Sequence, residues 1–144
     1  MKIKQISLFM ENKPGRLSVP TRILAQNGID IRAMYLADTQ DYGILRMIVA
    51  DTQKAVAVLE AQDFVVKVTE VLAVAVSDRP GGLADVLTAL DGTGINIEYM
   101  YAIPYPHGDG AILIFRFADT EEAMTRLQAK GVNLLAGEEI LQKK

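Results

Sequence analysis

Two stretches of the chain repeat each other and decide its fold. Residues 14–35 read PGRLSVPTRILAQNGIDIRAMY, and residues 80–101 read PGGLADVLTALDGTGINIEYMY. The offset is 66 residues, and 9 of the 22 aligned positions are identical. Ordinary residue frequencies would give about one or two matches by chance. Farther along, Ala50-Asp51-Thr52 recurs as Ala118-Asp119-Thr120 at an offset of 68. The chain is therefore an internal duplication, which predicts two modules, residues 1–68 and residues 69–144.

Each repeat contains the signals of six secondary-structure elements. In the first, an apolar strand at 6–10 is followed by turn residues and by helical spacing over 17–24 that ends at Asn27-Gly28. Strands are predicted at 29–35, 44–49 and 64–66, and Asp51-Thr52 is expected to cap a helix that runs to residue 59. The second repeat gives the same elements at 70–77, 82–91, 95–103, 111–117, 120–130 and 132–135. Residues 138–141 are expected to add a short strand.

The element order predicts an α+β fold. The order β-α-β-β-α-β, found twice, is the ferredoxin-like unit, an antiparallel four-stranded sheet with both helices on one face. Residues 64–76 contain no Gly, Pro or Ser, so the last strand of the first repeat should run directly into the second repeat.

Two local patterns sharpen this prediction. Pro20 lies within the first predicted helix, so that helix should begin late, near residues 16–18, or bend at the proline. The apolar residues Ile29, Ile31, Ala33 and Tyr35 alternate with other residues, as expected for one face of a strand.

The bulk composition excludes several classes of function. The net charge is −3 and the pI is about 5.1, without the basic face that nucleic-acid binding requires. No cysteine is present, which rules out disulfides, thiolate catalysis and cysteine-based zinc sites. The first residues have no signal-peptide apolar core, and no apolar run is long enough to span a bilayer. We therefore expect a cytoplasmic protein that binds neither nucleic acid nor membrane.

Two strand-to-helix corners are the candidate binding elements. They read Asn12-Lys13-Pro14-Gly15 and Asp78-Arg79-Pro80-Gly81, each just before a predicted helix. A helix N-terminus presents free N–H groups that suit a carboxylate or a phosphate, and the glycines permit a close approach. Asn12 and Asp78 can accept hydrogen bonds from an ammonium group. The alternative, a turn with a helix cap and nothing bound, remains open at this point.

These corners carry a resemblance to a known family. A short apolar strand, then [DNS]-x-x-Pro-Gly-x-Leu, a helix and Gly-Ile-[DN]-Ile, resembles the ACT domain family, and both halves match: residues 12–17 with 28–31, and residues 78–83 with 94–97. The resemblance implies two modules whose antiparallel sheets pair side by side through the second strands. It also implies that a free amino acid binds where the corner of one module meets the second strand of another.

The resemblance also implies which residues bind. Carried over by position, the candidate ligand-binding residues are Asn12, Pro14, Gly15, Asp30, Ile31, Asp78, Gly81, Gly82, Asn96 and Ile97. Ile31 and Ile97 are expected to act through their backbones, because alternation places their side chains on the helix-covered face. Asn12 is replaced by Asp78 in the second copy, and Asp30 by Asn96, so the two sites are expected to differ in affinity.

No catalytic set is apparent. The single histidine, His107, lies in a predicted hairpin loop and cannot supply a catalytic or metal constellation by itself. Neither a nucleotide-binding loop nor a cofactor motif is present. We therefore predict a non-catalytic, amino-acid-binding regulatory or sensor protein without metal or cofactor, acting on a partner enzyme and forming a homodimer. The alternatives are a regulatory small subunit of an amino-acid biosynthetic enzyme of the acetolactate synthase type, an enzyme on this scaffold, and a purely structural pair of modules.

Overall fold

A computed structural model describes residues 1–38, 41–103, 108 and 110–141. The chain divides into two compact units, which we call the N-terminal module (residues 4–69) and the C-terminal module (Met1–Ile3 with the chain from Glu70 onward). The N-terminal module contains β1 (Ile3–Glu11), α1 (Ser18–Gln26), β2 (Ile31–Asp38), β3 (Tyr42–Val49) and α2 (Thr52–Glu60). The strand β4 (Val65–Ser77) follows. The C-terminal module continues with α3 (Gly82–Thr88), β5 (Ile97–Ala102), β6 (Gly110–Phe117), α4 (Thr120–Ala129), β7 (Asn133–Leu135) and α5 (Gly137–Leu141).

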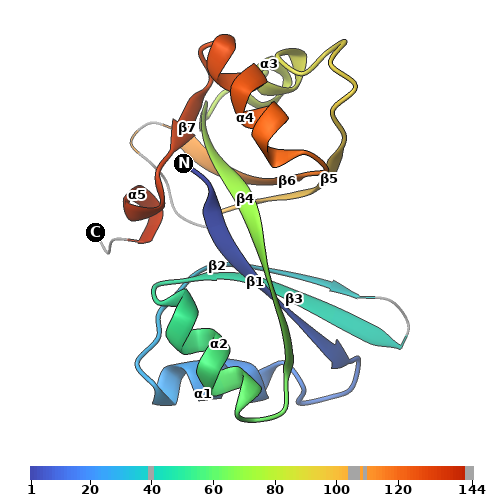
Figure 1. Cartoon of the computed structure of the whole chain (residues 1–144), viewed down its shortest axis with the longest axis vertical. Coiled ribbons are helices and arrows are strands. Elements are labelled where there is room, and N and C mark those ends of the chain that lie inside the picture. The colour runs from blue at the N-terminus through green and yellow to red at the C-terminus, as the bar shows by residue number, and fades with distance from the viewer. Residues whose placement is uncertain (39–40, 104–107, 109, 142–144) are drawn as a thin grey trace. The chain divides into compact units, whose positions relative to one another are not determined.

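Each module is a β-α-β-β-α-β unit, which confirms the predicted fold class (Figure 1). The strand order is β4-β1-β3-β2 in the N-terminal module and β7-β4-β6-β5 in the C-terminal module. The same order therefore occurs twice, with the second strand of each unit at an edge of its module's sheet. Strand β4 is 13 residues long and serves both modules, as the absence of turn residues in this stretch predicts.

Helices cover one face of each sheet, and the core of each module lies between them. In the N-terminal module, Leu24 of α1 and Leu59 of α2 pack on Leu45 of β3, and all three are fully buried. In the C-terminal module, Leu127 of α4 packs with Phe115 and Phe117, whose rings stack with centroids 5.6 Å apart. Burial of these side chains supplies the main stabilising term of each module.

The second helix of each module is capped by an aspartate. The Asp51 side chain accepts from the Lys54 N–H at 3.1 Å, and the Asp119 side chain accepts from the Glu122 N–H at 3.0 Å. Pro20 is the third residue of α1, where a missing N–H removes no helical hydrogen bond, so the helix begins late as predicted.

One alternation pattern differs from the prediction. A shift in pairing between Ile31 and Ala33 places both Ile31 and Met34 opposite residues of the helix-side core, Val49 and Met47. The same shift recurs between Ile97 and Tyr99. These β-bulges each insert one extra residue, so side chains after the bulge exchange faces. Ala33 and Tyr35 therefore do not share a face with Ile31.

The predicted strand at residues 138–141 is wrong. Residues Gly137–Leu141 form the helix α5 instead. The Glu139 N–H donates to the Ala136 carbonyl, and the Ala136 N–H donates to the Glu139 carboxylate at 2.6 Å, a reciprocal arrangement that starts a helix.

Candidate functional site

The strand-to-helix corners have the same backbone shape in both modules. Gly15 and Gly81 adopt left-handed conformations with φ of 82° and 91°. The Arg16 N–H donates to the Lys13 carbonyl at 3.2 Å, and the Gly82 N–H donates to the Arg79 carbonyl at 3.1 Å. A left-handed residue at this turn strongly favours glycine, which explains why the Pro-Gly pair occurs twice.

The helices that follow these corners begin without a side-chain cap. Neither Leu17, which precedes α1, nor Gly81, which precedes α3, provides a capping oxygen. This contrasts with Asp51 and Asp119, which cap the second helix of each module. The corners are therefore the helix starts at which backbone N–H groups have no local side-chain acceptor.

The predicted corner residues are exposed, with one exception. Asn12, Pro14 and Gly15 lie at the surface, as do Asp78 and Gly81. Gly82 is buried, and a Cβ atom at this position would lie 2.2 Å from the Ser77 carbonyl oxygen. The structure therefore gives Gly82 a packing role, because α3 starts directly against the end of β4.

The other predicted residues lie far from the corner of their own module. Glu11 pairs with Tyr42 at the first residue of β3, whereas Ile31 pairs with Val49 at the last. Strands rise about 3.4 Å per residue, so the corner and the start of β2 are separated by roughly 24 Å along β3.

The C-terminal module repeats this separation. Ser77 pairs with Gly110 at the first residue of β6, and Ile97 pairs with Phe117 at the last. One module by itself therefore cannot unite a corner with the start of a second strand. The assignment of Asn12, Asp30, Asp78 and Asn96 to one kind of site stays a prediction.

The starts of the second strands are engaged in local bonds. The backbone carbonyls of Asp30 and Asn96 accept from Ala50 and Ala118 at 2.9 and 3.1 Å. The Asp30 carboxylate also pairs with the Arg32 guanidinium at 3.0 Å. The side chains of Ile31 and Ile97 pack against the two helix-side cores, so only their backbones remain for a ligand, as expected.

Two adjoining hollows mark the corner of the C-terminal module. Their volumes are about 510 and 470 Å³, within the range of small-molecule sites, and both are lined by Ser77, Arg79 and Asn133. Asp78 lines the first hollow and Gly82 the second. At the corner of the N-terminal module, the hollow lined by Asn12 and Lys13 is about 60 Å³, and a second hollow, lined by Glu11 and Arg16, is about 300 Å³. The two corners are therefore unequal in the room they offer.

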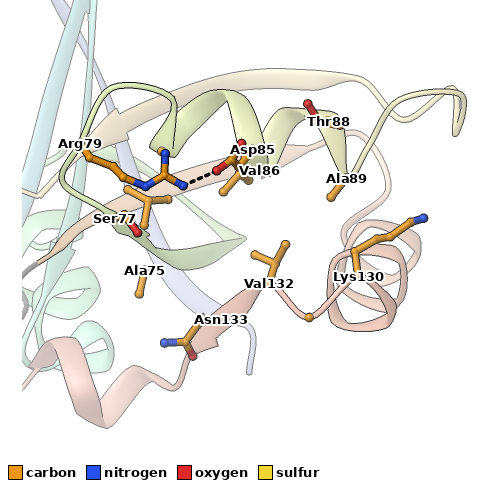
Figure 2. Close-up of a pocket in the computed structure, with 13 residues that line it drawn as sticks. Ala75, Ser77, Arg79, Asp85, Val86, Thr88, Ala89, Lys130, Val132 and Asn133 are labelled. Carbon is orange, nitrogen blue, oxygen red and sulfur yellow. Dashed lines mark hydrogen bonds and ion pairs between the residues drawn. The ribbon is translucent and has the colours of Figure 1, made fainter.

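The charges at the two corners also differ. In the C-terminal module, the Arg79 guanidinium lies 2.6 Å from the Asp85 carboxylate (Figure 2). Within the described part of the chain, the Asp78 carboxylate has no hydrogen-bond or ion-pair partner. In the N-terminal module, Lys13 lies 2.7 Å from Glu11, and the hydrogen bond that Lys13 donates lowers the pKa of the Glu11 carboxyl.

Sequence reasoning missed Arg79, Asp85 and Asn133. Arg79 lies inside the corner motif, but at one of its unspecified positions. Asn133 follows α4, 55 residues after Asp78, and reaches the same hollow because β7 pairs with β4. Strand pairing across that separation left no signal in a single sequence.

The described residues contain no group of three or more His, Asp or Glu side chains placed to hold a metal ion. None of their helices is both long and apolar enough to cross a membrane. His107 lies outside the described residues, so its surroundings remain untested.

A family model and a solved structure both match nearly the whole chain. The family model "ACT domain pair" matches residues 1–143. The crystal structure of protein BT0572 from Bacteroides thetaiotaomicron has a TM-score of 0.92 and 37% identity, covering 99% of this chain and 98% of that one. The search among curated proteins gives no match.

Two more distant structures have the same fold. The ligand-free regulatory subunit of aspartate kinase from Thermus thermophilus has a TM-score of 0.64 and 21% identity, covering 89% of this chain and 90% of that one. The corresponding subunit from Thermus flavus has a TM-score of 0.60 and 20% identity, with 88% of each chain covered. With a family model that spans nearly the whole chain, this protein belongs to the ACT domain family as a pair of ACT domains.

Proposed function

We propose that this ACT domain pair is a non-catalytic regulatory protein that binds a free L-amino acid at its strand-to-helix corners. The observation that carries the proposal is the pair of hollows at the corner of the C-terminal module. The hollow of about 510 Å³ is lined by the guanidinium of Arg79 and by the carboxylate of Asp78, which has no partner among the residues that the structure describes. An α-amino acid carries an ammonium and a carboxylate on adjacent atoms, and these two groups match that pairing of charges.

A complete site on this proposal needs more than one module. Each corner lies roughly 24 Å from the second-strand start of its own module, by the strand rise. A second module, in the same chain or in a second copy, would therefore supply the backbone at Asp30 and Ile31, or at Asn96 and Ile97. A homodimer would provide further modules for this purpose.

The two corners should not bind equally. Asn12 is neutral and lines a hollow of about 60 Å³, whereas Asp78 is anionic and lines one of about 510 Å³. Both the room and the charge favour the corner of the C-terminal module for an ammonium-bearing ligand. The corner of the N-terminal module is expected to bind more weakly.

The regulatory output is expected to act on another protein. Ligand binding can shift a partner's activity only if the ligand prefers one of two states. The proposed partner is a cytoplasmic enzyme. A second candidate is a regulatory subunit held permanently by an amino-acid biosynthetic enzyme, of the acetolactate synthase type. Two structures of similar length named as regulatory subunits of aspartate kinase favour a subunit role of this general kind.

A thermal-shift screen against the twenty amino acids tests the binding proposal. A ligand present at 100 times its Kd stabilises the folded state by about 2.7 kcal/mol. For a chain of this size we expect a rise of roughly 5–10 °C in Tm. Asp78→Ala should remove most of that rise, and Asn12→Ala should remove little. No shift with any amino acid at millimolar concentration would refute the proposal.

A further inference from the structure

One of the two hollows at the C-terminal corner is a groove that has an apolar wall and a charged end. This groove, of about 470 Å³, runs between α3 and the loop that joins α4 to β7; we call it the α3 groove. In Figure 2, Ala75, Val86 and Val132 surround one space, and the paired side chains of Arg79 and Asp85 lie at one end of it. An apolar floor with a charged end is the chemistry of a site for an amphipathic small molecule.

The charged end has a carboxylate and a guanidinium within reach of one ligand. Arg79 and Asp85 lie 2.6 Å apart, and their side chains are 55% and 66% exposed. Exposed ion pairs contribute little to stability, so breaking the Arg79–Asp85 pair costs little free energy. Asp85 can then pair with the ammonium of a ligand, and Arg79 with its carboxylate. Arginine also binds carboxylates through two parallel hydrogen bonds.

The apolar floor consists of small side chains. Ala75, Val76, Val86, Ala89 and Val132 line the groove, and none of them carries a charge or a side-chain hydrogen-bonding group. The groove is also lined by the polar residues Ser77, Thr88, Lys130 and Asn133, and in Figure 2 the Lys130 amine points away from the space between Ala75, Val86 and Val132. A charged ligand side chain that rests on the apolar floor would lose hydration without a partner in that floor. An aliphatic side chain would instead gain from leaving water.

The equivalent place in the N-terminal module is smaller. A hollow of about 300 Å³ lies at the equivalent position, and each of its eight lining residues occupies the repeat position of a residue that lines the α3 groove. There, Arg16 replaces Gly82 and Phe9 replaces Ala75. The hollow ends at Arg16 and does not extend along α1.

The charged pair is also confined to the C-terminal module. The repeat offset of 66 places Val19 at the position of Asp85 and Lys13 at that of Arg79. Ile23 stands where Ala89 opens the floor of the groove. This shape and this charge pattern therefore occur in the C-terminal copy of the repeat and not at the equivalent residues of the N-terminal copy.

We propose that the α3 groove binds the side chain of an aliphatic α-amino acid, whose ammonium contacts Asp85 and whose carboxylate contacts Arg79. The inference rests on the proposed amino-acid binding and narrows it to a ligand class and to one module. It replaces Asp78 by Asp85 as the contact of the ammonium, so on this inference Asp78→Ala should weaken norvaline binding little, in contrast to the loss expected for a ligand held by Asp78.

A homologous ligand series tests the apolar floor. The full-length protein is titrated calorimetrically with L-alanine, L-2-aminobutyrate and L-norvaline, and each ligand in this series is one methylene longer than the one before. Each buried methylene should tighten binding about four-fold. Ala89→Ile, which introduces the residue of the first repeat, should weaken norvaline binding more than alanine binding. Equal affinities along the series would overturn the assignment of the floor.

A charge exchange tests the charged end. The double variant Arg79→Glu, Asp85→Lys keeps an ion pair at the surface but swaps the positions of its positive and negative charges. It should weaken norvaline binding at least ten-fold. The control exchanges Glu122 and Arg126 of α4, a second exposed pair 2.8 Å apart that does not line the groove, and should leave binding unchanged. Asp85→Asn provides the same test if the exchange impairs folding, as judged by circular dichroism.

The outcomes separate this inference from the broader proposal. If amino acids bind and the affinity ignores the Arg79–Asp85 exchange but falls with Asp78→Ala, the α3 groove is refuted and the amino-acid-binding function stands. If no amino acid binds, both are refuted. If arginine or glutamate binds more tightly than norvaline, the aliphatic class is wrong.

Discussion

Replacing Gly82 with alanine is expected to destabilise the protein by about 2 kcal/mol. The added Cβ would lie 2.2 Å from the carbonyl oxygen of Ser77, whereas real Cβ atoms essentially never come closer than 3.0 Å. Either α3 or the end of β4 must therefore move by at least 0.8 Å. The strand resists that movement because Ser77 is paired with Gly110 of β6.

The magnitude follows from two opposing terms. Overpacking of a fixed site costs about 1–3 kcal/mol, and a contact with the backbone at 2.2 Å puts Gly82→Ala at the upper end of that range. Alanine gains at most about 1 kcal/mol over glycine in a helix interior, and less at Gly82, which is the first residue of α3. The net loss of about 2 kcal/mol corresponds to a fall in Tm of roughly 4–8 °C for a chain of this size.

Thermal unfolding followed by circular dichroism, together with urea titration, measures this loss. Arg16→Ala is the matched control, because Arg16 occupies the position of Gly82 in the first repeat and a side chain is already accommodated there. Gly15→Ala separates contact from conformation: its φ is 82° and nothing lies within 4 Å, so only the left-handed backbone opposes the change. A Gly82→Ala protein whose Tm lies within about 1 °C of the parent's would show far less than the expected fall. That result would refute the claim that the added Cβ clashes with the Ser77 carbonyl.

Three further outcomes are expected. Asp119→Ala removes the side-chain cap of α4 and should cost about 1 kcal/mol in urea unfolding. Leu59→Ala opens a cavity in the N-terminal core and should cost about 2–5 kcal/mol, whereas Val65→Ala, at a side chain 65% exposed, should cost under about 0.5 kcal/mol. The hydrogen bond from Lys13 lowers the pKa of Glu11 in the folded protein, so its contribution is present at neutral pH and lost as the pH falls through that lowered pKa. The stability difference between Lys13→Gln and the parent should therefore shrink as the pH falls below the ordinary pKa of a glutamate and vanish once the pH is below the lowered pKa of Glu11, and a difference that persists in stronger acid would contradict this assignment.

Much of the fold could be predicted because the two halves of the sequence repeat each other and can be compared. The duplicated Pro-Gly pairs identify the corners, and the structure gives Gly15 and Gly81 the left-handed conformations that explain them. The long strand β4 follows from a stretch without turn residues. The position of Pro20 predicted the late start of α1, because proline is tolerated only in the first turn.

The bulges in β2 and β5 were beyond sequence reasoning. Alternation placed Ala33 and Tyr35 on the face of Ile31, and one extra residue in each strand reversed that assignment. A bulge depends on pairing with the neighbouring strand, and single-sequence periodicity does not report that pairing. The helix α5 was also missed. Its start depends on the reciprocal hydrogen bonds between Ala136 and Glu139, which apolar periodicity does not indicate.

By itself, the sequence determined the duplication, the order of elements and the family, because local turn chemistry and apolar periodicity are written in neighbouring residues. Tertiary structure alone decided the rest. It brought Asn133 beside Asp78, placed each corner and its second-strand start at opposite ends of a strand, and gave Gly82 a packing role. Those facts depend on which strands pair and how closely a helix approaches them, and such long-range contacts leave no pattern between neighbouring residues.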